Sequence, residues 1–208
     1  MIEQGTPEWF AQRCGKATAS RIADIIAKTK SGPSASRKNY HAQLVAERLT
    51  GTVEQSYTNA AMQWGNDKEP DARAAYAFLH ADGFDVVTAE FIQHPSIIMS
   101  GASPDGYVGD EGMVEIKCPN TATHIETLLG KNVPAKYVTQ MQWQMACTGR
   151  AWCDFASFDP RLPDHLSLFV RRVPRDDAYI AELEAEVRAF LLEVSATVSA
   201  LEKYAEAA

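Results

Sequence analysis

The chain has few cysteines, no long apolar run and no secretory leader. Its four cysteines form no CxxC pair and match no zinc-ligand spacing, so we expect reduced, mostly buried thiols at Cys14, Cys118, Cys147 and Cys153. No stretch approaches the ~20 uninterrupted apolar residues that span a membrane. The opening decapeptide, MIEQGTPEWF, lacks the basic head and apolar segment of a signal peptide. These absences argue against a disulfide scaffold and an integral membrane protein, and they predict a cytoplasmic protein without a membrane partner.

An overall excess of positive charge is also missing. The net charge of the 208 residues is −7, which does not by itself suggest nucleic-acid binding. The charge is uneven, however: residues 1–50 contain 8 Lys and Arg against 4 Asp and Glu, whereas the rest contains 12 against 23. Because a local patch sets the field in a groove, the basic first quarter leaves an anionic partner open. With 46% hydrophobic and 23% charged residues, the composition predicts one globular domain over residues 1–208.

Hydrophobic periodicity and turn residues predict helices first and strands later. The expected helices cover residues 7–13, 20–28, 37–51, 58–81, 121–129, 135–149 and 176–204. The expected strands cover residues 84–92, 97–101, 105–108, 113–118, 151–158 and 166–172, with a hairpin turn at 109–112. This order predicts an α/β or α+β domain built around one central sheet, with a helical N-terminal part and a long C-terminal helix.

Two segments of this scheme have alternative interpretations. Residues 29–36 are rich in Gly, Pro and Ser and predict a mobile surface loop, but their basic flanks also fit an arm over an anionic ligand. The last helix has an apolar stripe of helical period, from Ile180 through Val187 to Leu201. Packing on the chain's own sheet is the expected role of this stripe, and a subunit interface is the alternative.

One pair of short strands carries a pattern with chemical meaning. Glu115 and Lys117 lie on one face of the strand over 113–118, since side chains alternate with a period of two. Asp105 starts the partner strand and can reach the same face. Two converging carboxylates repel each other unless a cation lies between them, and hard oxygen ligands suit Mg²⁺ or Mn²⁺. With a nearby lysine, such a centre suits phosphodiester hydrolysis, although a surface hairpin with a Glu–Lys pair has the same pattern.

The wider sequence resembles a known family. The motif Pro104-Asp105…Glu115-Ile116-Lys117 resembles the core of the PD-(D/E)xK nucleases. Further words resemble the lambda exonuclease and YqaJ-type viral recombinase branch, in the family's order: Trp9…Arg13-Cys14-Gly15…Thr18-Ala19-Ser20, Trp64-Gly65…Glu69-Pro70…Arg73, Ser103-Pro104-Asp105-Gly106, Glu115-Ile116-Lys117-Cys118-Pro119 and Gln140-Met141-Gln142. The resemblance covers about residues 8–175. It implies a restriction-endonuclease-like α/β core with a central mixed β-sheet flanked by helices.

The resemblance implies roles for the residues that match its motifs. Asp105 and Glu115, with the carbonyl of Ile116, would bind the principal Mg²⁺ ion. Glu69 would complete a second metal position with Asp105. The alternative interpretation of Glu69, apart from the motif, is an exposed glutamate on a helix. Lys117 would position or activate the attacking water. Gln140 would support the site from its helix, and its alternative is an ordinary hydrogen bond without a catalytic role.

A second group of matching residues concerns the DNA end. Arg13, Ser20 and Ser103 match positions that hold the 5′-terminal phosphate, which suits a guanidinium fork and hydroxyl donors. Ser20 has the alternative of a helix N-cap. Met62 matches the apolar wedge that separates the terminal base pair, and its alternative is core filling.

The chain departs from the family pattern ten residues before Asp105. The family has a further acid there, whereas this chain has Pro95 beside His94. His94 could substitute as a polar group, but we expect a loop histidine without a metal role, so the departure concerns the second metal position and not the first. The four tryptophans could be base-stacking platforms, but their positions favour core packing: Trp9, Trp64, Trp143 and Trp152.

The resemblance implies a specific activity. The protein would be a 5′-to-3′ exonuclease that depends on Mg²⁺, with two ions per site and Mn²⁺ as an alternative ion. It would act on the ends of linear double-stranded DNA, release 5′-mononucleotides and leave 3′ single-stranded tails. It further implies a ring-shaped homotrimer and a single-strand annealing protein as partner in phage or prophage recombination within a bacterial host. The alternatives are a structure-selective or single-strand nuclease of the same fold, and a non-catalytic DNA-end-binding module.

Overall fold

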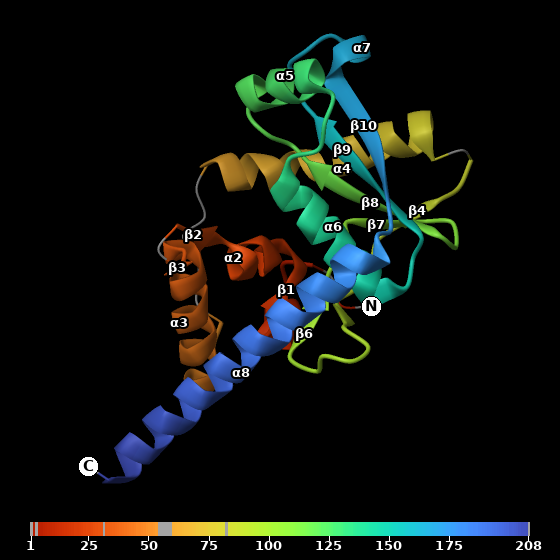
Figure 1. The fold of residues 1–208 in the computed structure, drawn as a ribbon. Helices are drawn as coiled ribbons and strands as arrows, with labels where there is room; N and C mark the ends of the chain where they lie inside the picture. Colours follow the sequence, from red (N-terminus) through yellow and green to blue (C-terminus); the bar gives the residue numbers. More distant parts are fainter. Residues whose placement is uncertain (1, 3, 31, 54–59, 82, 208) are drawn as a thin grey trace.

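A five-stranded sheet forms the centre of the molecule. The computed structural model describes every residue except 1, 3, 31, 54–59, 82 and 208. The spatial order is β10-β9-β8-β7-β4 (Figure 1), and the strands are β4 (Val86–Val87), β7 (Gly106–Val108), β8 (Gly112–Lys117), β9 (Trp152–Phe158) and β10 (Leu168–Pro174). β8 and β9 are parallel and the other neighbours antiparallel, so the predicted mixed sheet is confirmed. The parallel pair needs a crossover, which α5 (Thr121–Gly130) and α6 (Ala135–Thr148) supply.

Two helices cover opposite faces of this sheet. α4 (Ala60–His80) packs Tyr76 into a buried cluster with Ile116 of β8. On the other face, Met145 of α6 packs with Met113 of β8. Because β8 side chains alternate between the faces, Glu115 lies on the α6 side together with Met113.

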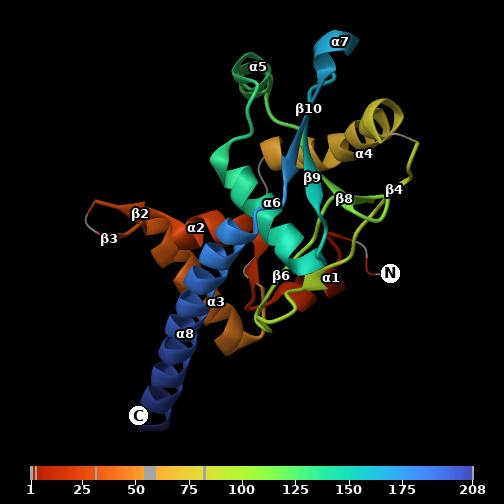
Figure 2. The ribbon, with the colours of Figure 1, turned by 45° about the vertical axis from the view of Figure 1, so that its right-hand side comes forward.

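A smaller sheet joins the N-terminal part to the middle of the chain. β6 (Ser100–Ala102) pairs in parallel with β1 (Ala17–Thr18) and antiparallel with β5 (Ile92–Gln93). α1 (Pro7–Arg13) therefore lies beside β6 (Figure 2). α1 begins as predicted, with Thr6 capping the Trp9 N–H and Pro7 at the first helical position. This pairing brings residues about 90 positions apart into one region.

α8 (Asp177–Ala207) packs mainly on helices, but Ile180 near its start joins a buried cluster with Met113 and Phe155 of the central sheet, so the expected sheet packing holds only for the start of the helix. Its buried residues, among them Leu183 and Phe190, join a cluster with α2 (Ile22–Ile26) and α3 (Ala35–Thr50). The apolar period defines a face of the helix but not the surface that covers it. The last turns extend beyond the body of the molecule (Figure 1).

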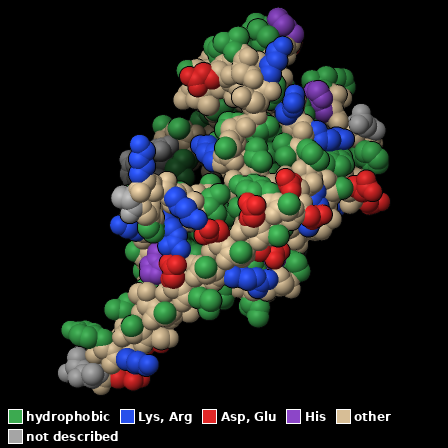
Figure 3. Space-filling view, viewed as in Figure 1, with side chains coloured by type: hydrophobic (Ala, Val, Ile, Leu, Met, Phe, Trp, Pro, Cys, Tyr) green, Lys and Arg blue, Asp and Glu red, His purple; other side chains and the backbone are tan. Residues whose placement is uncertain are grey.

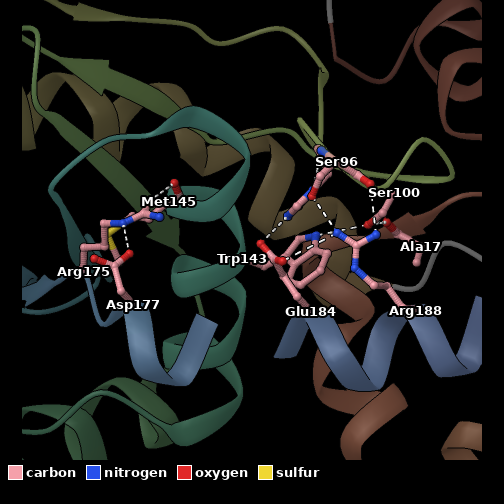
Figure 4. Close-up of polar contacts among 10 residues, drawn as sticks. Ala17, Ser96, Ser100, Trp143, Met145, Arg175, Asp177, Glu184 and Arg188 are labelled. Atoms are coloured by element: carbon pink, nitrogen blue, oxygen red, sulfur yellow. Dashed lines mark hydrogen bonds and ion pairs between the residues drawn. The ribbon is translucent and has the colours of Figure 1, made fainter. Parts of the chain in front are cut away.

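Polar contacts fix α8 beside the small sheet (Figure 4). Arg188 donates to the carbonyl and hydroxyl oxygens of Ser96 at 3.0 and 2.7 Å. The buried Trp143 of α6 donates its indole N–H to Ser100 at 3.1 Å, and Ser100 donates to the Ala17 carbonyl at 2.6 Å. These bonds satisfy buried polar groups and hold β1, β6 and α6 together.

The predicted mobile loop at 29–36 is instead a short hairpin followed by a helix start. The hairpin comprises β2 (Lys28–Thr29) and β3 (Gly32–Pro33), and Ser34 caps α3; Ser31 lies outside the described residues. Lys28 pairs with Glu186 at 2.6 Å and Arg37 with Glu193 at 2.8 Å, so two cations of the proposed arm face acidic residues of α8. Figure 3 shows Asp and Glu side chains along α8 and Lys and Arg side chains nearby.

Most other elements follow the prediction, with one clear exception. The helix expected at 58–81 is α4, whose first expected residues, 58 and 59, lie outside the described residues, and the segment 20–28 is a 3₁₀ turn (Ala19–Arg21) followed by α2. The strand expected at 84–92 is wrong: only its ends pair, in β4 with the central sheet and in β5 with the small one. α7 (Asp164–Ser167) is an unpredicted short helix before β10.

The cysteines and the helix hydropathy are both consistent with a protein that lacks disulfides and membrane-spanning helices in its described part. All four cysteines are free thiols, of which three are buried and Cys14 is half-buried, as predicted. Among the helices of the described residues, none combines the length and hydropathy of a membrane span.

Candidate active site

The register of β7 and β8 places two acidic residues opposite each other. Gly106 pairs with Val114, so Asp105, just before β7, faces the position of Glu115. The backbone N–H of Ile116 donates to Asp105 Oδ2 at 2.7 Å, which fixes the Asp105 side chain against β8. Asp105 is partly exposed, whereas Glu115 is fully buried. The structure thus brings together the acidic pair that the hairpin pattern predicts.

Three donors surround the Glu115 carboxylate. Lys117 forms an ion pair with Oε1, as expected for two side chains on the same strand face. Gln140 of α6 donates to the same oxygen at 2.6 Å, and Gln144, one helical turn later, donates to Oε2 at 2.6 Å. Gln144 was not among the site residues predicted from the sequence. Its i, i+4 spacing from Gln140, which places both on one helix face, is the signal that could have found it.

Glu69 approaches the site from α4. Arg73, four residues later, donates to Glu69 Oε1 at 2.5 Å and to the Asp105 carbonyl at 2.9 Å. Arg73 thereby ties α4 to the segment that carries Asp105. Glu69 is partly buried, so it is not the exposed helical glutamate of the alternative interpretation. Arg73 is the last residue of the motif that begins at Trp64, but no role was predicted for it from the sequence.

Burial and mutual repulsion shape the charges of this site. Burial raises the pKa of Asp105 well above its usual value, and the neighbouring Glu115 and Glu69 raise it further against the opposing effects of Lys117 and the Ile116 N–H. Burial likewise raises the pKa of Glu69. For Lys117, burial lowers the pKa, but Glu115 and Asp105 more than offset this and raise it above its usual value. A cation among these carboxylates would therefore be stabilised.

The donor set fits a hard divalent cation. The acidic groups and the backbone supply oxygen ligands only, which Mg²⁺ and Mn²⁺ prefer. Within the described part of the chain, no group of three or more His, Cys, Asp or Glu side chains is arranged to hold a metal ion, so any ion here would need backbone, water or substrate oxygens as well. Mg²⁺ commonly uses only one or two carboxylates and leaves positions for water and substrate phosphate, so Asp105 and Glu115 with the Ile116 carbonyl suit it.

A cleft of about 1050 Å³ leads from α1 to Glu69, and it contains most of the predicted DNA-end residues. Arg13, Ser20, Met62 and Glu69 all line it, although they come from separate segments. Met62 is 46% exposed, so the core-filling alternative is wrong. Ser20 lies inside the 3₁₀ turn, and Thr18 and Arg21 occupy the N-cap positions there, so the N-cap alternative is wrong too.

The surroundings of the Arg13 guanidinium suit the binding of an anion. It donates to the Ser103 hydroxyl at 3.1 Å, as does the Trp9 indole N–H, and its guanidinium lies 4.0 Å from the centre of the Trp9 ring. Burial lowers the pKa of Arg13 to about 10, although Tyr40 and Glu47 oppose the shift, so it remains a cation at neutral pH. The residues that the structure describes give it no ion pair, which leaves charge available for a ligand in the cleft.

His94, beside the position where the chain departs from the family pattern, packs against other residues than those of this site. His94 is buried, stacks on Trp143 with ring centres 4.9 Å apart, and lies 3.3 Å from Glu184 of α8. Its Nδ1 accepts from the Ser96 N–H at 3.2 Å. His94 therefore packs between α6 and α8 in this structure.

The tryptophans divide between core and cleft. Trp143 is fully buried, and Trp64 and Trp152 pack partly buried against the cluster between α4 and the central sheet, as core packing predicts. Trp9 instead lines the cleft and contacts Arg13.

Comparison with solved structures identifies close relatives. An alkaline exonuclease from Laribacter hongkongensis is 54% identical, with a TM-score of 0.90 over 97% of this chain and 98% of that one. The same enzyme in complex with dAMP gives the same identity and TM-score over 98% of this chain and 100% of that one. A phage-related exonuclease from Haemophilus somnus 129PT, at 18% identity and a TM-score of 0.72 over 89% and 96% of the chains, shares the fold.

Two further comparisons concern sequence alone. A comparison with curated proteins gave no match. Residues 8–151 match the YqaJ-like viral recombinase domain, and this stretch holds most of the motifs and both acidic residues of the central pair. The chain belongs to the family of the YqaJ-like viral recombinase domain.

Proposed function

We propose that the protein is a Mg²⁺-dependent 5′-to-3′ exonuclease on linear double-stranded DNA. It releases 5′-mononucleotides and leaves 3′ single-stranded tails for recombination by strand annealing. One observation carries the proposal: Ser103, which contacts Arg13 in the cleft, is two residues from Asp105, which faces Glu115. Two residues span at most about 7 Å, so a terminal phosphate at Arg13 would lie close to the cleavage centre. The relative solved with dAMP supports a mononucleotide product.

The residues divide the work between binding and chemistry. Bound Mg²⁺ or Mn²⁺, one or two ions held by Asp105, Glu115, the Ile116 carbonyl and Glu69, would supply an activated water and offset charge on the phosphate. Lys117 is an ammonium group, so its role is to hold the attacking water and to stabilise negative charge on the phosphoryl oxygens. Gln140 keeps Glu115 in place.

The DNA-end residues favour a duplex substrate. Arg13, Ser20 and Ser103 would hold the 5′-terminal phosphate through charge-assisted hydrogen bonds. Met62, exposed in the same cleft near the start of α4, would press against the terminal base pair. An exposed apolar side chain at this place has a function on paired strands and little on a single strand, which favours the duplex exonuclease over its alternatives.

We also propose a homotrimeric ring and an annealing partner. The cations of the N-terminal quarter that line the cleft, Arg13, Lys16 and Arg21, would face the channel, while the acidic surface of α8, which pairs with Lys28 and Arg37, would face outward (Figure 3). The 3′ tail would pass to a single-strand annealing protein of the phage or prophage, in the cytoplasm of the bacterial host.

The mass of the protein in solution tests the ring. Sedimentation equilibrium should give three times the chain mass of 22.9 kDa, and a mass of one chain would contradict the ring.

Replacement of Lys117 tests the catalytic assignment. On a linear duplex, the wild-type protein should release 5′-mononucleotides with Mg²⁺, little with EDTA, and far less from single-stranded DNA. Lys117→Ala should lower this rate at least about 10²-fold, because it removes a preorganised charge, and should still bind DNA ends in a gel shift. Lys203→Ala, exposed near the end of α8, is the matched control. A Lys117→Ala rate near wild type would contradict the assignment, and Mg²⁺-independent binding without cleavage would favour the end-binding alternative.

Replacement of Arg13 tests the phosphate pocket. Arg13→Ala should reduce digestion of 5′-phosphorylated ends by about 10- to 100-fold, the equivalent of one or two lost charge-assisted hydrogen bonds, with little effect on 5′-hydroxyl ends. Arg171→Ala, exposed on β10, should change neither rate. Equal losses on the two kinds of end would argue against the pocket.

A further inference from the structure

The Glu115 carboxylate is held at both oxygens by two amides of the same helix. Gln140 donates to Oε1 and Gln144 to Oε2, each at 2.6 Å. Both glutamines are buried, and Gln144 has no exposed surface. A carboxylate bonded at both oxygens cannot rotate about its last side-chain bond without losing a donor, so this arrangement fixes its plane.

The orientation of Gln144 is unfavourable for Gln144 itself. Its Oε1 is buried without a hydrogen-bond partner in the described part of the chain. A buried acceptor left unpaired costs stability, and native proteins rarely retain one. Turning the amide over would instead point its oxygen at a carboxylate, so the charge of Glu115 dictates the observed orientation. Within the described part of the chain, the side-chain amide of Gln144 therefore makes its hydrogen bond to Glu115 and leaves its own oxygen unpaired.

We propose that Gln144 is a positioning residue that, with Gln140, holds the Glu115 carboxylate in the correct orientation to receive a divalent cation. The inference rests on the proposed function, since it assigns Gln144 to the same metal centre. Groups that hydrogen-bond a metal ligand from behind orient it and raise metal affinity, typically by 10- to 100-fold. Gln144 contacts neither DNA nor the reacting atoms in this account and acts through Glu115 alone.

Gln142 provides a control from the same helix. It is also buried, but it donates to the Pro174 carbonyl at 2.8 Å and accepts from the Asp176 N–H at 2.9 Å. It therefore joins α6 to the connection between β10 and α8, and its amide bonds to backbone groups there and not to the Glu115 carboxylate. Substitutions of Gln142 and Gln144 both remove a buried amide from α6, and only that of Gln144 removes a hydrogen bond to Glu115.

The test measures cation binding by the full chain without DNA. Mn²⁺ binding is followed by the electron paramagnetic resonance signal of free Mn²⁺, for wild type, Gln144→Met and Gln142→Met. Gln144→Met, which keeps the side-chain length and removes the amide, should bind Mn²⁺ about 10- to 100-fold more weakly. Gln142→Met should bind like wild type, and DNA-end binding in EDTA should be unchanged in both. Mn²⁺ affinity of Gln144→Met within about threefold of wild type, or an equal loss in Gln142→Met, would overturn the proposal.

A second variant keeps the test valid if Gln144→Met fails to fold. Gln144→Asn retains a buried amide but is one methylene too short for Glu115, so it should bind Mn²⁺ as weakly. Wild-type affinity in this variant also overturns the role of Gln144. Failure of the proposed function has a different result: the wild-type protein itself would bind no Mn²⁺, or Glu115→Gln would bind it unchanged.

Discussion

The whole site depends on two carboxylates held face to face in a partly buried place. The β7–β8 register puts Asp105 opposite Glu115, and burial with mutual repulsion raises the pKa of Asp105. Such a pair is stable only because donors surround it: the Ile116 N–H on Asp105, and Lys117 with two α6 amides on Glu115. The rest of the fold supplies these donors from three directions, and a divalent cation is the ligand that this concentration of negative charge favours.

The remaining elements connect this pair to a binding cleft. The parallel pairing of β1 with β6 carries α1 to the segment before Asp105, so that Arg13 meets Ser103. Arg73 joins α4 to the Asp105 backbone and brings Glu69 within range of the pair. Recognition of an anionic end and the proposed cleavage centre thus share one stretch of chain, and a disturbance of β6 would affect both. α8 contributes from outside by fixing the Ser96 loop through Arg188.

Local periodicity predicted much of the fold, and long-range pairing explains what it missed. The strict alternation of Glu115, Ile116 and Lys117 sufficed to place the acid and the lysine on one face, because side-chain direction in a strand is a local property. The strand expected at 84–92 failed because this segment leaves one sheet and enters another, which no local pattern encodes. The Arg13–Ser103 contact likewise depends on a sheet pairing across about 90 residues; only the family resemblance put those two residues together. Gln144 was within reach of a helical-spacing argument, but the orientation of its amide was not.

Every proposed step of the cleavage requires a divalent cation shared by Asp105 and Glu115. The most direct measurement is a crystal structure of the protein with Mn²⁺, with the ion located by its anomalous scattering. We expect an anomalous peak between the Asp105 and Glu115 carboxylates, at about 2.0–2.3 Å from one oxygen of each. A structure with Mn²⁺ bound elsewhere, or with the two carboxylates turned apart and no ion between them at saturating Mn²⁺, would contradict it.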